Sequence, residues 1–349
     1  MLGFEVVRGL MTSSIIINKL FALTGAVWLG VSVLGYGKDV FLPSWADGAS
    51  RANVLRFVDE VTDEESANYV KPADRVAVFD NDGTLWAEQP YYFQLIYAFD
   101  QVKEQAADHP EWKNTEPFKS VLAGDYQAVL KGGEKAILEL VMATHAGMST
   151  EEYSQSVAKW IATAKHPTSG LLIKEMVYQP MLELLDYLRD EEFKTYIVSG
   201  GGIDFMRVFA EEVYGIPPEQ VIGSRLEVEF VNEAGEPRLM RRGKLAFVDD
   251  KGGKPVGIHT HIGKRPIACF GNSDGDLAMM QWTHAGKGAR FCMYIHHTDA
   301  EREWAYDHPS HIGHFEKGLI EAKENQWTVV DMKNDWIKIF PQEKKTTKP

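Results

Sequence analysis

Cysteine is scarce in this 349-residue chain, which contains only Cys269 and Cys292. Two thiols cannot build a disulfide framework, and their separation is not a metal-ligand spacing. Cys269 lies in an apolar run, so core packing is a better interpretation of this residue than chemistry. The sequence therefore speaks against a disulfide-stapled scaffold and against a thiolate metal site.

An excess of basic residues is also missing, because 37 lysines and arginines face 50 aspartates and glutamates, a net charge of −13. A nucleic-acid-binding surface needs a basic stripe, so we expect no nucleic-acid partner. We find no internal repeat. The length suffices for two units with a sizeable core, and a hydrophobic content of 44% is normal for a globular protein.

The N-terminal segment has the pattern of a targeting sequence. No charged residue occurs between Leu20 and Gly37, Lys19 stands just before this run, and Gly35 and Gly37 fit the small-residue positions of a cleavage site. We expect residues 1–37 to be a signal peptide, with an uncleaved membrane anchor as the alternative. Translation can begin at Met1 or at Met11, and a start at Met11 gives a shorter signal. Both alternatives place the rest of the chain in the periplasm or outside the cell.

The residues 76–85 are the stretch around which the rest of the sequence is organised. Val76 to Phe79 read as a buried strand, and Asp80-Asn81-Asp82-Gly83-Thr84 follows it. Open α/β sheets carry their chemistry at this end of a strand, and Gly83 permits the turn that would bring both carboxylates to one point. Such carboxylates repel unless a cation neutralises them, and oxygen clusters suit Mg²⁺. The stretch predicts a metal-assisted site with an aspartate nucleophile; the alternative is an Asx turn.

A second unit of strand and loop comes later in the chain. A predicted strand over 194–198 leads into Ser199-Gly200-Gly201-Gly202, and a helix is predicted over 203–214. Glycines let backbone N–H groups converge on an anion, and a helix N-terminus favours negative charge. We interpret this loop as phosphate-binding, against the alternative of a flexible turn.

A third unit has a predicted strand over 266–270 and the loop Gly271-Asn272-Ser273-Asp274-Gly275-Asp276. The loop presents three oxygen-bearing side chains, more than a simple helix cap needs. Before it, the loop around residues 248–255 holds two candidate lysines, Lys251 and Lys254. Farther on, His296, His297 and Asp299 are interpreted as a surface loop in preference to a metal cluster.

The segment between the first and second units reads as helical over residues 88–169, with a capping box at Ser149 and Glu152. It is too long for a loop, so we expect a separate cap. The core should comprise 38–87 and 170–340, and we expect 341–349 to be disordered. The predicted fold is therefore α/β, a Rossmann-like parallel sheet core with an inserted all-helical cap domain.

These loops, in this order, resemble the motifs of the haloacid dehalogenase superfamily. Residues 80–84 resemble its first motif, Ser199-Gly200 the second, a lysine before the last loop the third, and 271–276 the fourth. The resemblance covers roughly residues 74–300, and the helical insert is similar to the C1 cap of the phosphoserine-phosphatase-like branch.

The resemblance implies a Mg²⁺-dependent phosphatase that acts on small phosphomonoesters through an aspartyl-phosphate. Asp80 would be the nucleophile, and Asp82 would protonate the leaving oxygen and then activate water. Lys254 would be the cation, since Gly-Lys-Pro fits the family spacing, with Lys251 in reserve. The implied phosphate and substrate contacts are Thr84, Ser199, Gly200, Lys254 and Glu88; the implied metal ligands are Asp80, Asp82, Asn272 and Asp276.

Two departures from the family pattern stand out. The family commonly has aspartate where this chain has Asn272, so Asn272, Asp274 and Asp276 all remain candidates for completing the metal site. Phosphoserine phosphatases carry a glutamate nine residues after the nucleophile, where this chain has Gln89 beside Glu88. We therefore expect no phosphoserine specificity. The alternatives are a phosphotransferase or an inactive phosphate-binding protein; a dehalogenase would not need Asp82.

Overall fold

The computed structural model describes residues 41–342. The predicted signal or anchor, residues 1–37, lies outside the described residues, as does nearly all of the predicted disordered tail. Among residues 41–342, no helix combines the length and apolarity needed to cross a bilayer.

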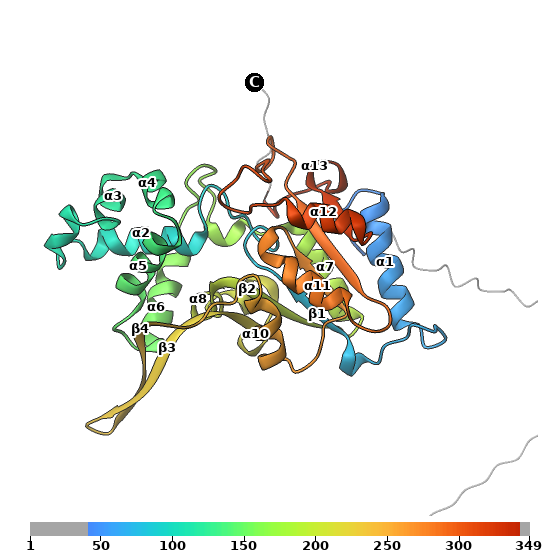
Figure 1. The fold of residues 1–349 in the computed structure, drawn as a ribbon, viewed down its shortest axis with the longest axis horizontal. Helices are drawn as coiled ribbons and strands as arrows, with labels where there is room; N and C mark the ends of the chain where they lie inside the picture. The colour runs from blue at the N-terminus through green and yellow to red at the C-terminus, as the bar shows by residue number, and fades with distance from the viewer. Residues whose placement is uncertain (1–40, 343–349) are drawn as a thin grey trace, which may run out of the picture. The chain divides into compact units, whose positions relative to one another are not determined.

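Seven strands form a single sheet in the order β4-β3-β2-β1-β5-β6-β7. All neighbours are parallel except β3 and β4, which form an antiparallel hairpin. The strands are β1 Val76–Phe79, β2 Lys194–Gly202, β3 Val221–Glu233, β4 Glu236–Phe247, β5 Ala268–Gly271, β6 Phe291–His296 and β7 Thr328–Asp331. The α/β prediction with a Rossmann-like parallel sheet is therefore confirmed, with one antiparallel edge strand (Figure 1).

Helices cover both faces of the sheet. The side chains of β1 alternate between these faces, so each face contributes to a separate apolar layer. Ala77 and Phe79 face the layer that contains α1 Ala49–Thr62 and α7 Gln179–Asp190. Val76 and Val78 face the layer that contains α10 Gly253–His261, α11 Leu277–His284 and α12 Lys317–Glu324. The remaining short helices of this part are α8 Ile203–Met206, α9 Ala210–Tyr214 and α13 Met332–Asp335.

The segment between β1 and β2 is helical, as its texture indicates. It contains α2 Phe93–Gln105, α3 Phe118–Ala123, α4 Tyr126–Lys131, α5 Gly133–His145 and α6 Thr150–Ile161. Residues of α2 to α5 share an apolar cluster of their own, and α6 begins at the predicted capping box of Ser149 and Glu152. The helices α2 to α5 thus share a small core of their own, whereas α6 packs through Tyr153 and Val157 into the larger cluster that also contains Ala77 and Phe79.

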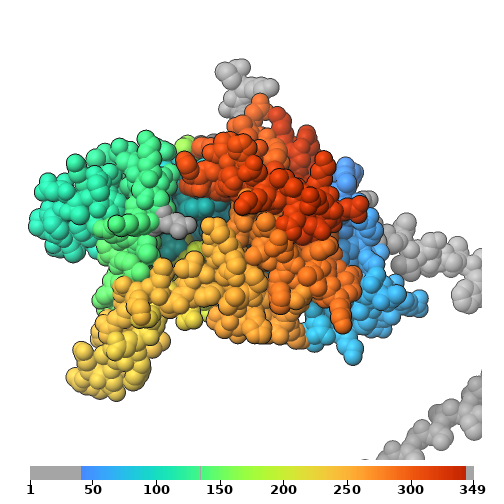
Figure 2. All heavy atoms as spheres, viewed as in Figure 1, coloured from blue at the N-terminus to red at the C-terminus, as the bar shows by residue number. Residues whose placement is uncertain are grey.

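The β3–β4 hairpin ties this helical insert to the sheet edge. The Arg241 N–H donates to the Met148 carbonyl, and the Gly147 N–H donates to the Arg241 carbonyl. The Arg241 guanidinium pairs with Asp204 and lies 3.9 Å from the centre of the Tyr153 ring. Figure 2 shows the insert and the hairpin on the same flank of the molecule.

One predicted helix differs from the structure. The sequence predicts a continuous helix over residues 203–214, but the chain forms α8 and α9 with a break at residues 207–209. Phe209, at this break, stacks on Trp86 with ring centres 4.6 Å apart and packs on Tyr214. The aromatic packing fixes Phe209 with backbone angles outside the helical range, which apolar periodicity does not reveal.

Candidate active site

The predicted functional loops meet at the carboxyl edge of the sheet. Phe79, the last residue of β1, is paired with Ile197 of β2 on one side and Phe270 of β5 on the other. The three loops that follow these strands therefore emerge side by side. The parallel pairing alone brings together segments that are more than 100 residues apart in the chain.

Lys254 joins two of these loops through an ion-paired cluster. Its Nζ lies 2.6 Å from Asp80 Oδ1 and 2.6 Å from Asp276 Oδ1, and it donates to the Val198 carbonyl at 3.0 Å. The lysine is only 2% exposed. Lys251, the alternative in the sequence, has an exposed side chain and its Nζ lies 3.6 Å from Asp250 Oδ2. The structure therefore places Lys254, and not Lys251, beside Asp80.

Protonation in this cluster is governed by burial and like charges. Burial raises the pKa of Asp80 to about 8, Asp276 adds to the effect, and Lys254 opposes it. Burial alone would lower the pKa of Lys254, but Asp276 and Asp80 raise it above its ordinary value. The lysine is therefore cationic. The single positive charge of Lys254 does not offset the burial of Asp80 and the negative charges of Asp276 and Asp82 beside it.

Asp82 occupies a different environment from Asp80. Its Oδ1 accepts a hydrogen bond of 2.8 Å from the indole Nε1 of Trp86. Burial raises its pKa to about 6, while the Trp86 hydrogen bond and Lys254 lower it. Gly83 follows with φ +74°, a left-handed angle that glycine adopts without strain. The turn thus places one aspartate against the Lys254 ammonium and the other against the Trp86 indole N–H.

The Ser199 loop is anchored from the helical insert. Strand β2 continues through the glycines with a register shift between Ser199 and Gly202. The Gly201 N–H donates to Ser199 Oγ at 3.1 Å, and the Gly202 N–H donates to Gln94 Oε1 at 2.7 Å. Gln94 belongs to α2, and sequence reasoning missed it. The predicted helix N-terminus beyond the loop is reduced to α8, a helix of four residues.

The asparagine and the two aspartates of the third loop have different partners. Asp274 accepts hydrogen bonds from the backbone N–H groups of residues 316–318 at the start of α12. Asp276 accepts from the N–H groups of Asn272 and Ser273 and from Lys254. Asn272 Oδ1 accepts a hydrogen bond from the Thr84 hydroxyl, at 3.3 Å. Asp274 therefore caps a helix and Asp276 binds the lysine, whereas the amide oxygen of Asn272 contacts Thr84 of the first loop.

Glu88 lies behind Asn272 and is only 2% exposed. Its Oε1 accepts hydrogen bonds from Asn272 Nδ2 and from the Tyr306 hydroxyl, each at 2.7 Å. Burial raises the pKa of Glu88 well above its usual range. Thr84 is fully buried. Both residues, assigned to substrate by the resemblance, thus contact Asn272 in this structure.

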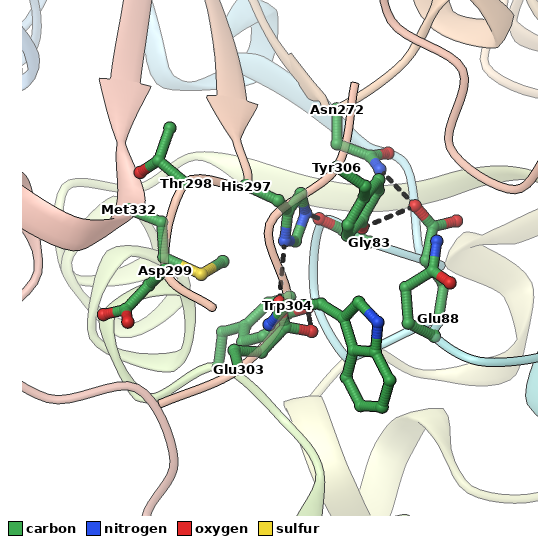
Figure 3. Close-up of polar contacts among 12 residues, drawn as sticks. Gly83, Glu88, Asn272, His297, Thr298, Asp299, Glu303, Trp304, Tyr306 and Met332 are labelled. Atoms are coloured by element: carbon green, nitrogen blue, oxygen red, sulfur yellow. Dashed lines mark hydrogen bonds and ion pairs between the residues drawn. The ribbon is translucent and has the colours of Figure 1, made fainter. Parts of the chain in front are cut away.

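A loop after β6, residues 297–314, packs against the first loop, a contact that sequence reasoning missed (Figure 3). His297 Nε2 lies 2.8 Å from the Gly83 carbonyl, and its ring stacks on Tyr306. His297 and Asp299 are 2% and 1% exposed, so the interpretation of this stretch as a surface loop is wrong. The two adjacent histidines were its only visible signal.

The donor set fits a divalent cation only if an amide and a backbone carbonyl take part. Within residues 41–342, no three His, Cys, Asp or Glu side chains converge as a metal-binding group. Asp80, Asp82 and Asp276 nevertheless share one lysine, Lys254, and the Glu88 carboxylate adds negative charge near Asp80 and Asp82. A cation with a preference for oxygen would relieve this excess of negative charge.

Several solved structures are similar to this chain. A protein of unknown function from Bordetella pertussis Tohama I is 13% identical with a TM-score of 0.46, over 74% of this chain and 98% of that one. A probable phosphoserine phosphatase from Vibrio cholerae is 14% identical with a TM-score of 0.38, over 76% and 62%. Cytosolic 5′-nucleotidase IIIB bound to cytidine is 13% identical with a TM-score of 0.39, over 72% and 82%.

No curated protein matches the chain in sequence. The family model of the haloacid dehalogenase-like hydrolases matches residues 77–281, which is more than half of the 349 residues. The chain therefore belongs to this family of hydrolases, and the predicted resemblance to the superfamily is confirmed.

Proposed function

We propose that this haloacid dehalogenase-like hydrolase is a phosphatase that hydrolyses small phosphomonoesters with Mg²⁺ as cofactor. The observation that carries the proposal is the contrast between the two aspartates of one loop. Asp80 is ion-paired with Lys254, whereas Asp82 is held by Trp86 with a pKa of about 6. Lys254 favours the charged form of Asp80 that would attack phosphorus, and Asp82 is suited to donating and accepting a proton near neutral pH.

In the first half of the proposed reaction, an Asp80 carboxylate oxygen attacks phosphorus and the bond from phosphorus to the ester oxygen breaks. Asp82 gives its proton to that leaving oxygen, so an alcohol departs and Asp80 carries the phosphoryl group as an aspartyl-phosphate. Lys254 stabilises the negative charge and keeps the attacking oxygen in place through its 2.6 Å contact.

In the second half, Asp82 takes a proton from water, and the water oxygen attacks phosphorus. Inorganic phosphate leaves, and Asp80 returns to its carboxylate form. The Ser199 hydroxyl and the Gly200 N–H are proposed to hold the phosphoryl oxygens in both halves. Because Thr84 is buried and donates to Asn272, we propose that it acts through that amide and not on phosphate.

The proposed metal ligands are the Asp80 carboxylate, the backbone carbonyl of Asp82 and the Asn272 amide oxygen. Bound there, Mg²⁺ would neutralise charge that develops on the phosphoryl oxygens. Asp276 is better suited to positioning Lys254 than to binding metal, because both of its oxygens already accept hydrogen bonds from this loop and from the lysine.

The helical insert of residues 88–169 is proposed to act as a cap over the substrate. Gln94 supports this role, since this insert residue reaches the phosphate-binding loop at Gly202. Export through residues 1–37 also remains a proposal. N-terminal sequencing of the mature protein from a periplasmic or secreted fraction would distinguish cleavage from anchoring.

Phosphate release from a broad panel of phosphomonoesters tests the activity, with and without EDTA. We expect hydrolysis of several small esters, its loss with EDTA and its recovery on adding Mg²⁺. Asp80→Asn should abolish turnover, and Asp82→Asn should lower kcat by roughly 10²–10⁴-fold. Asp74→Asn, at an exposed ion pair with Lys264, is the control and should remain active.

Product analysis in the presence of an added alcohol distinguishes hydrolysis from phosphotransfer. Free phosphate as the main product supports a phosphatase, whereas a new phosphoester would indicate a phosphotransferase. Absence of turnover on the whole panel, together with tight binding of a phosphate analogue, would instead identify an inactive binding protein.

A further inference from the structure

Asn272 has a fixed orientation, although an amide supplies no charge to a metal site. Its Nδ2 donates to Glu88 Oε1 at 2.7 Å, and its Oδ1 accepts from Thr84. An amide nitrogen only donates and an amide oxygen only accepts hydrogen bonds, so a carboxylate at Nδ2 determines which end of the amide is which. The Glu88 contact thereby turns the oxygen of Asn272 away from Glu88 and toward the first loop.

The Glu88 carboxylate is buried against two glycines, Gly313 and Gly83. A Cβ added at Gly313 would lie 2.2 Å from Glu88 Oε1, and one at Gly83 would lie 2.5 Å from the same atom. Within residues 41–342, no lysine, arginine or histidine forms an ion pair with Glu88; its partners are the neutral donors Asn272 and Tyr306. A buried carboxylate with only neutral partners is costly unless a cation lies nearby.

The loop after β6 holds Glu88 in this place. Tyr306 donates to Glu88 and stacks on His297 with ring centres 4.4 Å apart, while His297 contacts the Gly83 carbonyl. Figure 3 shows the Glu88 carboxylate beside both Asn272 and Tyr306, with His297 beside Gly83. The same contacts therefore fix the turn at Gly83 and the carboxylate behind it.

We propose that Glu88 is a positioning residue, which orients the Asn272 amide and supplies from behind it the negative charge that an aspartate at position 272 would carry. The inference rests on the proposed function, since it concerns the Mg²⁺ site of that reaction. Chemically, the pair Glu88–Asn272 replaces a directly ligating carboxylate by a neutral ligand that is polarised by a carboxylate.

Calorimetric titration of the metal-free full chain with Mg²⁺ tests the proposal without reference to turnover. Glu88→Gln keeps an acceptor for Asn272 but removes the charge, and we expect affinity to fall roughly 10–100-fold, as for other outer partners of metal ligands. Combining it with Asn272→Asp returns one carboxylate to the site. We expect this double variant to recover Mg²⁺ affinity to within a few-fold of the wild type.

Glu303→Gln is the matched control, because Glu303 is a buried carboxylate that contacts His297 and Tyr178 but not Asn272. We expect it to bind Mg²⁺ as the wild type does. Circular dichroism of each variant establishes that it is folded before titration.

The proposal is overturned if Glu88→Gln binds Mg²⁺ as tightly as the wild type, or if the double variant binds no better than Glu88→Gln alone. A wild-type protein that binds no Mg²⁺ would overturn it as well. A wild-type protein that binds Mg²⁺ but hydrolyses no phosphomonoester would defeat the proposed function, while the expected pattern of affinities would still support the role of Glu88.

Discussion

Asp249 offers a quantitative test of the electrostatics around the site, because replacing it by asparagine removes one buried titrating group. The residue is fully buried, and neither of its carboxylate oxygens has a hydrogen-bond partner of normal geometry. A Cβ added at Gly257 would lie 2.4 Å from its Oδ1, so α10 packs directly against it. Burial raises the pKa of Asp249 to about 7, Lys254 opposes this and Asp250 adds to it.

The size of the effect follows from the two pKa values. The folded protein holds the Asp249 proton up to a pH of about 7, whereas the unfolded chain releases it near 3.8. Each unit of difference corresponds to about 1.4 kcal/mol, so the group contributes at most about 4 kcal/mol to the free energy of unfolding. Because the folded pKa is raised, this contribution is fully present below about pH 4 and is lost as the pH rises to about 7.

Urea unfolding in EDTA at several pH values between 4 and 8, followed by tryptophan fluorescence, measures this term. The asparagine amide adds an offset that does not depend on pH, so the difference between Asp249→Asn and wild type should grow in favour of the variant by up to about 4 kcal/mol across the range. Asp190→Asn, at an exposed position, controls for the substitution itself. A difference for Asp249→Asn that stays constant with pH would refute the reasoning.

Three further predictions concern the site and the core. Lys254→Met leaves Asp80 and Asp276 without their cation, so it should lower kcat at least about 10²-fold and destabilise the fold by about 3–5 kcal/mol. The control Lys251→Met should change neither the rate of phosphate release nor the stability in urea. Gly83→Ala and Gly124→Ala each place alanine at a positive φ, which should lower the free energy of unfolding by about 1–2 kcal/mol. Only the former brings a Cβ to 2.0 Å from Asn272, so only it should also lose activity in the phosphate assay. Cys269 and Cys292 are buried, so a thiol reagent should label them only at the rate of unfolding; fast labelling of the native protein would contradict the packing.

Hydrophobic pattern predicted the sheet well because its central strands are buried on both faces. Val76 to Phe79 and the residues around Cys269 form apolar runs that end at polar loops, and β1 and β5 occupy these runs. The same logic located the loops of the site, since parallel strands bring their carboxyl ends to one edge. The hydrophobic pattern failed to predict the break between α8 and α9, where the stacking of Phe209 on Trp86 determines the backbone conformation.

The loop after β6 was missed for a different reason, which bears on how this site is built. His297 and Gly83 are 214 residues apart in the chain, and Tyr306 and Glu88 are 218 apart. The contacts join polar groups to each other and to a backbone carbonyl, so they leave no apolar period in the sequence. The loops that carry the reacting side chains follow buried strands and can be read from them. The layer that holds those side chains in place consists of long-range polar contacts, and only the folded chain reveals it. Substitution of His297 or Tyr306 should therefore act on the site through Gly83 and Glu88, although neither residue contacts Asp80 in any hydrogen bond or ion pair that the described structure shows.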